Sequence, residues 1–390
     1  MEFKTELSPI TALCFEYFAG SKERSDLHFK ENNPPVFRIE GELETFPIGE
    51  LGGSPVIDNV YAKQFIHDLY RLRWGDDKGK VLFEEFLENG YQDDFAVDIT
   101  TDVRARVNIY KSMGTLNAAL RQIPAEMPML ENIGFDGVHQ NVIKATLAKR
   151  EGLILITGQT GSGKSTTLAS FINYINRTHK KHVVTIEDPV EFRHKNEKSL
   201  ISHREIGSDT ETFFTGLRAS LREDPDIILV GEMRDPETAL AAMQAAQTGH
   251  IVLATLHTNS APETVTRLLD MFPPEKSDSI RTSLAQALLM IISQKLPPTL
   301  AKKRALCYEI MLNNQAIKST ITNDKQGYDT KIKDIMQAEI PRGMIPMPNK
   351  LANMVKATMI DEATAREYCG SSKDDQNRLN LALGKPIDRF

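Results

Sequence analysis

Residues 152–165 constrain the fold more than any other part of this sequence. They begin with the apolar run GLILITG, continue through QTGSG and end in Lys164 and Ser165. The spacing GxxxxGK[ST] between a buried strand and a helix is typical of a loop whose backbone amides cradle phosphate groups. Apolar side chains at helical spacing over residues 165–176 predict the helix. The segment therefore predicts a strand, a phosphate-binding loop and a helix within an α/β domain.

The loop supplies eight candidate nucleotide-binding residues. Its glycines let backbone amides approach phosphates closely, and the helix N-terminus adds a favourable dipole. Lys164 is placed to reach the β- and γ-phosphates of a nucleotide, and Ser165 to offer its hydroxyl to Mg²⁺. A chance glycine-rich turn is the structural alternative, which the flanking strand and helix disfavour. The candidates are Gly158, Thr160, Gly161, Ser162, Gly163, Lys164, Ser165 and Thr166.

A second apolar strand, at residues 227–230, is followed by Glu232. Open α/β sheets bind ligands at the carboxyl ends of their strands. A carboxylate there can hold Mg²⁺, or orient and deprotonate an attacking water. Glu232 is accordingly predicted as a catalytic residue and as a metal-associated one. The alternative is a solvated loop pair between Glu232 and Arg234.

Three carboxylates gather behind another apolar strand, in the segment TIEDPVEF at residues 185–192. Glu187, Asp188 and Glu191 would repel one another unless they share a cation. A metal-bound nucleotide supplies such a cation, so this segment is predicted to lie beside the phosphate site. A capping turn around Asp188 and Pro189 is the structural alternative.

Two histidines flank a further buried strand, at residues 251–255. His250 precedes the strand and His257 follows it, and either is able to hydrogen-bond a γ-phosphate. Zinc binding is poorly supported, because no cysteine or third histidine lies nearby in the sequence. A lone histidine is more often a satisfied structural residue. Taken with the other motifs, His257 is the catalytic candidate.

Arginines are the remaining candidates, because phosphoryl transfer commonly uses a cation delivered to the transition-state charge from elsewhere in the protein. Most surface arginines are solvated and contribute little. The sequence leaves open which arginine reaches phosphate. Those of the first domain are Arg104, Arg106 and Arg121, and those of the second are Arg218, Arg222 and Arg234.

The 390 residues are enough for two domains and a tail. The first part alternates short half-buried strands, within residues 34–43 and 95–110, with helices at 61–73 and 81–88, as in a small α+β domain. Later apolar strands, at 183–186, 227–230 and 251–255, alternate with amphipathic helices, as in a mostly parallel sheet. The predicted parts are residues 1–121, a linker at 122–135 that carries two prolines, an α/β domain at 136–345 and a helical tail at 346–390.

Composition excludes some classes of function. The net charge of −6 disfavours a bulk nucleic-acid binder. Three cysteines lie far apart without a CxxC pair, which disfavours a disulfide framework and fits a reducing cytoplasm. The N-terminus carries no signal pattern, and the longest apolar run, at residues 284–292, is too short to span a bilayer. We therefore expect any membrane association to be peripheral, through partners.

The four motifs together resemble those of the secretion-ATPase superfamily. GQTGSGKST, TIEDPVEF, DPDIILVGEMRD and TGHIVLATLHTN stand in the order of the Walker A motif, Asp box, Walker B motif and His box of PilT-like ATPases. Residues 25–43 resemble the opening of the family's N-terminal PAS-like domain, and residues 104–110 and 120–124 resemble its arginine-bearing strands. Residues 292–296 (ISQKL) and 316–325 (AIKSTITNDK) are also similar to family segments.

The resemblance implies an α/β protein with an N-terminal PAS-like α+β domain, followed by a RecA-like P-loop ATPase domain with a mostly parallel sheet. It implies ATP and Mg²⁺ as cofactors, a homo-hexameric ring, and an inner-membrane platform protein of a pilus or secretion machine as partner, with no direct nucleic acid. The implied place is the cytoplasmic face of the inner membrane. The same resemblance implies that Lys164 and Ser165 hold phosphate and Mg²⁺ and that Glu232 activates water. It implies that Glu187 and Glu191 form the acidic box and that His257 couples nucleotide state to the sheet. It also implies that the nucleotide is reached by Arg104, Arg106 and Arg121.

The sequence departs at two points from the pattern of other P-loop proteins and family members, and these departures indicate which branch of the family it resembles. The Walker B run ends in Gly231 and Glu232 rather than in Asp, which fits this superfamily. The tetracysteine motif and longer N-terminal region of pilus-assembly members are absent from this sequence, which favours retraction or type IV secretion. The main prediction is a hexameric ATPase motor for type IV pilus retraction and twitching motility. The alternatives are a DotB-like ATPase that energises conjugation-related type IV secretion, a nucleotide switch, and a nucleic-acid motor that the net charge disfavours.

Overall fold

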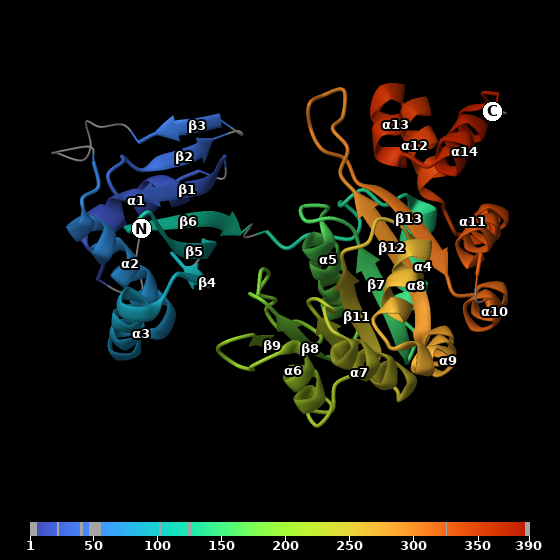
Figure 1. Ribbon diagram of the computed structural model, residues 1–390, viewed down its shortest axis with the longest axis horizontal. Helices are drawn as coiled ribbons and strands as arrows, with labels where there is room; N and C mark the ends of the chain where they lie inside the picture. The colour runs from blue at the N-terminus through green and yellow to red at the C-terminus, as the bar shows by residue number, and fades with distance from the viewer. Residues whose placement is uncertain are drawn as a thin grey trace. The chain divides into compact units, whose positions relative to one another are not determined.

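The computed structural model describes residues 6–21, 23–39, 42–46, 56–100, 103–123, 126–324 and 326–386. The chain divides into two compact units (Figure 1). The first comprises Met1–Met127 with Asp188–Phe192, and the second comprises Pro128–Glu187 with Arg193–Phe390. Pro124 and Ala125, which belong to the predicted linker, lie outside the described residues. Among the described helices, none is both long and apolar enough to cross a membrane.

The first unit is built on a six-stranded antiparallel sheet with strand order β3-β2-β1-β6-β5-β4. Helices α1 (Pro9–Ala19) and α2 (Asn59–Trp74) pack on it, and α3 (Asp76–Asn89) packs against α2. Side chains alternate along the strands, so Val107 of β5 is buried whereas Arg106 is exposed. The strands are β1 (Arg24–Lys30), β2 (Val36–Ile39), β3 (Glu42–Thr45), β4 (Gln92–Asp98), β5 (Arg104–Ser112) and β6 (Thr115–Ile123).

The two alternating segments predicted as half-buried strands each contribute to two strands of this sheet. Residues 34–43 contain β2 and the start of β3, and residues 95–110 contain the end of β4 and most of β5. The chain reverses between β4 and β5, where the backbone N–H of Ile99 donates to the carbonyl of Val103. The two predicted helices are confirmed as α2 and α3, and both extend beyond their predicted ends.

The second unit contains a seven-stranded sheet with strand order β13-β12-β7-β11-β10-β8-β9. All neighbouring pairs are parallel except β12 with β13. Every residue of β7, β10 and β11 is buried, as expected of parallel strands covered on both faces. The strands are β7 (Gly152–Thr157), β8 (His182–Glu187), β9 (Leu200–Glu205), β10 (Ile227–Val230), β11 (Ile251–Leu256), β12 (Leu288–Lys295) and β13 (Cys307–Leu312).

Helices cover both faces of this sheet, which confirms the predicted mixed α/β fold (Figure 1). Ile154 of β7 belongs to the hydrophobic cluster that contains Phe171 of α5, whereas Leu155 belongs to the cluster on the opposite face. The helices are α4 (Gly137–Leu147), α5 (Lys164–Thr178), α6 (Phe213–Ser220), α7 (Pro236–Gln247), α8 (Ala261–Asp270), α9 (Ser277–Ala287), α10 (Gln315–Asn323) and α11 (Tyr328–Ala338), with short 3₁₀ helices at Pro274–Lys276 and Ile340–Arg342.

Three further helices pack at the end of the chain: α12 (Met347–Lys356), α13 (Glu362–Cys369) and α14 (Lys373–Leu383). They share a small hydrophobic cluster with Cys307 of β13. The buried carboxylate of Glu309 on β13 accepts the backbone N–H groups of Ala261, at 2.6 Å, and Met347, at 3.1 Å. Glu309 therefore joins the first residues of α8 and α12, and the C-terminal helices are fastened to the sheet of the second unit.

Candidate functional site

The loop between β7 and α5 is shaped by glycines. Gly158, Gly161 and Gly163 all have positive φ angles. A Cβ at Gly158 would lie 2.4 Å from Ser162 Oγ and 2.5 Å from the carbonyl oxygen of Gln294, so a side chain there would displace the loop. Gly163 is the N-cap residue of α5. The first amides of α5, which have no intrahelical acceptor, thus lie at the end of a buried strand, where an anion is bound most readily.

Lys164, the first residue of α5, turns back over this loop. Its Nζ donates to the carbonyl oxygens of Gly158, at 2.7 Å, and Gln159, at 3.1 Å. The ammonium group is therefore held above the same loop that presents the amides. Ser165 and Thr166 follow in the first turn of α5. The predicted nucleotide-binding residues of this motif thus occupy a single loop and helix start.

Glu232 lies two residues beyond β10, and its carboxylate contacts two cationic or proton-donating groups. Its Oε2 lies 2.8 Å from Arg234 Nη2, and its Oε1 lies 3.2 Å from His257 Nε2. Because β10 and β11 are parallel neighbours, the residues that follow them meet at one edge of the sheet. The solvated loop pair considered as an alternative describes Arg234, whose side chain is 62% exposed, but not Glu232, which is 19% exposed.

The pKa of Glu232 reflects opposing effects. Burial raises the pKa, but the Arg234 guanidinium and the His257 ring outweigh burial and hold it below its usual value. Glu232 is consequently ionised at neutral pH, which is the form that can orient a water molecule and accept its proton.

Glu187, the last residue of β8, lies at the same edge of the sheet. β8 neighbours β10, and the backbone N–H of Gly231 donates to the carbonyl of Ile186 at 2.7 Å. A Cβ at Gly231 would approach Glu187 Cα to 3.3 Å, so the two acid-bearing segments run close together. Glu191 lies in Asp188–Phe192, the segment that groups with the first unit, and its role stays a prediction.

The three predicted arginines of the first unit differ in their surroundings. Arg104 is buried, and its Nη1 lies 3.0 Å from Asp98 Oδ1. Arg106 and Arg121 are cross-strand neighbours on β5 and β6. The side chain of Arg121 is 74% exposed, with Nε 2.8 Å from an oxygen of Asp26. Arg106 and Arg121 are therefore the more accessible of the three, and the role of all three stays a prediction.

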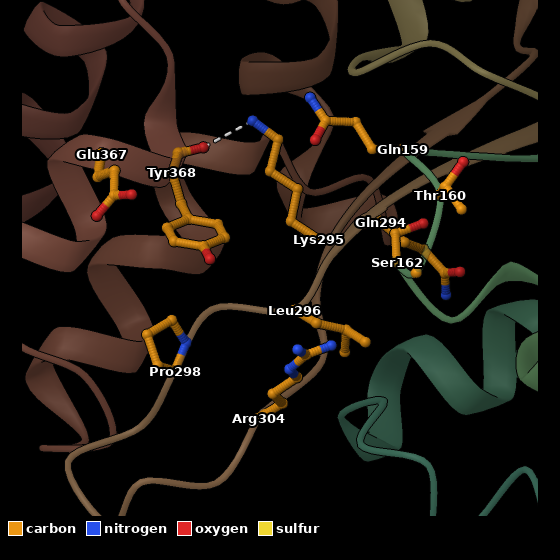
Figure 2. Close-up of a pocket in the computed structure, with 11 residues that line it drawn as sticks. Gln159, Thr160, Ser162, Gln294, Lys295, Leu296, Pro298, Arg304, Glu367 and Tyr368 are labelled. Carbon is orange, nitrogen blue, oxygen red and sulfur yellow. Dashed lines mark hydrogen bonds between the residues drawn. The ribbon is translucent and has the colours of Figure 1, made fainter. Parts of the chain in front are cut away.

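A cavity of about 560 Å³ lies beside the phosphate loop, within the second unit (Figure 2). Figure 2 shows Tyr368 of α13 and Pro298 on one side of it, and Gln159 and Ser162 of the loop on the other. Lys295 Nζ, at the end of β12, donates to the carbonyl oxygen of Tyr368 at 2.7 Å. The volume is in the range of small-molecule sites. The cavity is also lined by Thr160, Gly161, Gln294, Leu296, Arg304 and Glu367.

Two buried polar atoms in the lining residues suit a ligand. Ser162 Oγ and Gln294 Oε1 have no hydrogen-bond partner within the part of the chain that the structure describes. Gln294 Nε2 donates to Thr167 Oγ1 at 2.7 Å, which fixes the amide beside α5. Buried polar groups are normally satisfied by protein, water or ligand. The loop and the cavity together therefore have the volume and the polar groups to accept a nucleotide.

No role is predicted from the sequence for the residues that line this cavity from β12 and α13. The segment ISQKL contains Gln294 and Lys295, and the signal that identifies them is structural, because β12 lies beside β7. Tyr368 is far in the sequence from the phosphate loop and from ISQKL, and only the packing of α13 brings it to the cavity.

The donor set for a metal ion at this site is sparse. Within the described ranges, no group of three or more His, Cys, Asp or Glu side chains is arranged to hold a metal ion. Mg²⁺ usually keeps several waters and binds substrate phosphates with one or two protein ligands. Ser165, in the first turn of α5, and Glu232 are compatible with that sparse mode of binding.

Comparison with known proteins places these features in context. The sequence model of the type II/IV secretion system proteins matches residues 92–358. The type IV pilus retraction ATPase PilT of Pseudomonas aeruginosa is 37% identical over 350 residues, which cover 90% of this chain and 95% of that protein.

Two solved structures are similar over nearly the whole chain. The pilus retraction motor PilT with bound ADP has a TM-score of 0.78 and 36% identity, over 92% of this chain and 98% of that one. The Legionella pneumophila ATPase DotB has a TM-score of 0.73 and 26% identity, over 94% of this chain and 97% of its own.

Proposed function

Because the chain belongs to the type II/IV secretion system protein family, we propose that it is an ATP-hydrolysing motor that powers retraction of a type IV pilus. The observation that carries the proposal is the ionised Glu232, held by Arg234 and His257 at the sheet edge that also presents the phosphate loop. Its support is the similarity to PilT, which extends over both units of the chain.

The chemistry follows from the positions of the side chains. The amides of the loop and Lys164 bind the β- and γ-phosphates at the N-terminus of α5. Glu232 orients a water molecule and accepts its proton as the water oxygen bonds to the γ-phosphorus. The bond from that phosphorus to the bridging oxygen breaks, which leaves ADP and inorganic phosphate. Mg²⁺, held by Ser165 and associated with Glu232, would offset phosphate charge when bound. His257 donates to Glu232 and links the carboxylate to the end of β11.

The nucleoside part of ATP occupies the cavity between the loop and α13. Lys295 and Tyr368 supply a wall of this cavity from two elements, β12 and α13, that are joined by a hydrogen bond. A bound nucleotide therefore contacts the C-terminal helices as well as the phosphate loop.

The finer architecture belongs to the same proposal. The first unit is taken as PAS-like and the second as RecA-like, with domains at residues 1–121 and 136–345, a linker at 122–135 and a tail at 346–390. Subunits form a homo-hexameric ring that acts on an inner-membrane platform protein at the cytoplasmic face of the membrane. Glu187 and Glu191 form an acidic box, and Arg104, Arg106 and Arg121 supply positive charge toward the nucleotide.

A DotB-like role in type IV secretion is the alternative within the family. Its support is weaker, because the likeness to DotB has the lower identity, 26% against 36% for PilT. Deletion of the gene separates the two roles. Loss of pilus retraction with normal secretion supports the motor, and the reverse result supports the alternative.

The substitution Glu232→Gln tests the catalytic assignment. The amide keeps the size of the side chain but cannot accept the proton, so ATP binding is retained while kcat falls by about 10² to 10⁴. Nucleotide affinity and steady-state hydrolysis are measured on the same preparation, with the exposed Glu151→Gln as the matched control. Normal hydrolysis by Glu232→Gln would refute the assignment, and a wild-type protein that binds ATP without turnover would favour a nucleotide switch.

A further inference from the structure

We propose that His203, on the edge strand β9, is a positioning residue for the carboxylate of Glu187. The inference rests on the proposed function, because it gives Glu187 a part in ATP hydrolysis. His203 belongs to none of the four sequence motifs. It acts from the outermost strand of the sheet, through Glu187 rather than on the nucleotide.

The register of β8 and β9 brings the two residues together. Strands β8 and β9 lie side by side (Figure 1). They pair in parallel, with His203 opposite Thr185 and Glu205 opposite Glu187. Thr185 and Glu187 are two residues apart, so their side chains share one face of the sheet with His203. His203 Nδ1 lies 2.9 Å from Thr185 Oγ1 and 3.8 Å from Glu187 Oε1.

The hydrogen bond at Nε2 of His203 determines that the ring proton lies on Nδ1. His203 Nε2 accepts the backbone N–H of His194 at 3.0 Å. A neutral imidazole whose Nε2 accepts a hydrogen bond carries its proton on Nδ1. The Nδ1–H group is therefore directed toward Thr185 and Glu187, and protonation of Nε2 would break the bond to His194.

His203 lies in a partly buried place, against a second imidazole ring. The ring of His194 stacks on that of His203, with centroids 5.8 Å apart and 15° between the planes. Burial lowers the pKa of His194 to about 3, so the stacked ring carries no charge. The side chains of His203 and Glu187 are 19% and 17% exposed. An N–H dipole in such a partly buried place favours one orientation of the Glu187 carboxylate.

The orientation of the Glu187 carboxylate bears on catalysis because Glu187 lies close to Glu232 in the fold. Glu187 lies beside the segment that carries Glu232, where Gly231 N–H donates to Ile186. Catalytic hydrogen bonds are often long in ligand-free proteins and shorten when the substrate binds. The 3.8 Å separation leaves Glu187 within reach of a direct bond to His203 after a small rotation.

Two substitutions distinguish a positioning role toward Glu187 from a purely structural role toward His194, because the two roles use different ring nitrogens of His203. In His203→Asn the amide nitrogen takes the place of Nδ1 and the contact with His194 is lost. In His203→Gln the amide reaches His194, and the donor toward Glu187 is lost. We expect His203→Asn to keep kcat close to the wild type but to unfold at a lower temperature.

We expect His203→Gln to lower kcat by about tenfold or more, with the KM for ATP unchanged and the thermal midpoint better preserved. His182→Asn is the matched control, since His182 also bridges β8 and β9, through Ser202, at the opposite end of the strands. Equal kcat values for the Asn and Gln variants, or an active Gln and an inactive Asn variant, would overturn the positioning role alone. A wild-type protein without ATP turnover would overturn the proposed function and this inference with it.

Discussion

At the scale of single residues, Arg234 sets the pH range over which Glu232 stays ionised. Burial raises the pKa of Glu232, and Arg234 is the first of the contacts that hold it below its usual value. Arg234→Gln removes that contact, so the pKa rises toward the value that burial favours. Since the base must be ionised, the acidic limb of the kcat/KM profile moves to higher pH. The activity lost is therefore greatest at acidic pH.

The measurement is a pH–rate profile of the wild type, Arg234→Gln and Arg342→Gln. Arg342 is 78% exposed and pairs with Glu339 on the surface, so its profile should match the wild type. An acidic limb that stays in place in Arg234→Gln would show that Glu232 does not govern it.

Residues within one continuous motif could be predicted, whereas contacts between motifs could not. The glycines, Lys164 and Ser165 were predicted because strand, loop and helix are consecutive. Glu232 and His257 were each predicted from a separate strand. Their hydrogen bond depends on the parallel pairing of β10 with β11, which no local pattern encodes. The same holds for His203, whose register with β8 is set by tertiary pairing.

At the scale of elements, Glu309 joins the starts of α8 and α12. Each carboxylate oxygen accepts one backbone N–H, from Ala261 and from Met347. Glu309→Ala leaves both buried donors without their acceptor, which costs about 2–4 kcal/mol of unfolding free energy. Urea denaturation measures this loss, with the exposed Glu275→Ala as the control. Hydrogen exchange at the amides of Ala261 and Met347 should also be faster in Glu309→Ala than in the wild type. Unchanged protection of these amides would contradict the role of Glu309 in joining α8 and α12.

We expect helix α13 to contribute to nucleotide affinity through Tyr368. The ring lines the cavity and makes contacts that are expected to be equal in the ground and transition states (Figure 2). Tyr368→Ala should therefore raise the KM for ATP roughly three- to tenfold while leaving kcat unchanged. Tyr91→Ala is the matched control, because Tyr91 is 83% exposed. A change confined to kcat would place Tyr368 outside the binding contacts.

Elements with strong local signals could be predicted, and those that depend on a partner strand could not. Asp235 and Pro236 are local signals for a helix start, and Asp235 Oδ1 accepts the N–H of Thr238 at 2.7 Å at the beginning of α7. Gly249 has a φ of +97° after the helix ends, a conformation that glycine adopts readily. By contrast, residues 284–292 were considered only as an apolar run. They form the end of α9 and the start of β12, whose antiparallel partner β13 is separated from it by residues 296–306.

At the scale of the whole molecule, the candidate functional groups are divided between the two units. The phosphate loop, Glu232 and the cavity all belong to the second unit, whereas the three candidate arginines belong to the first. A protein that completes its site only in a ring should gain specific activity as the ring forms. A protein whose second unit is sufficient should have the same specific activity at every concentration.

We therefore expect Mg²⁺-dependent ATPase activity per subunit to rise with protein concentration, in step with the mass measured by light scattering in the same samples. Glu232→Gln is the control for cause and effect, because it should assemble at the same concentrations while remaining inactive. Arg121→Gln should leave the mass unchanged and lower the activity of the assembled form, since Arg121 has an exposed side chain and is one of the candidate cations of the first unit. A monomer with full and constant turnover would exclude the ring as a requirement for catalysis, and would assign the whole of the chemistry to the second unit.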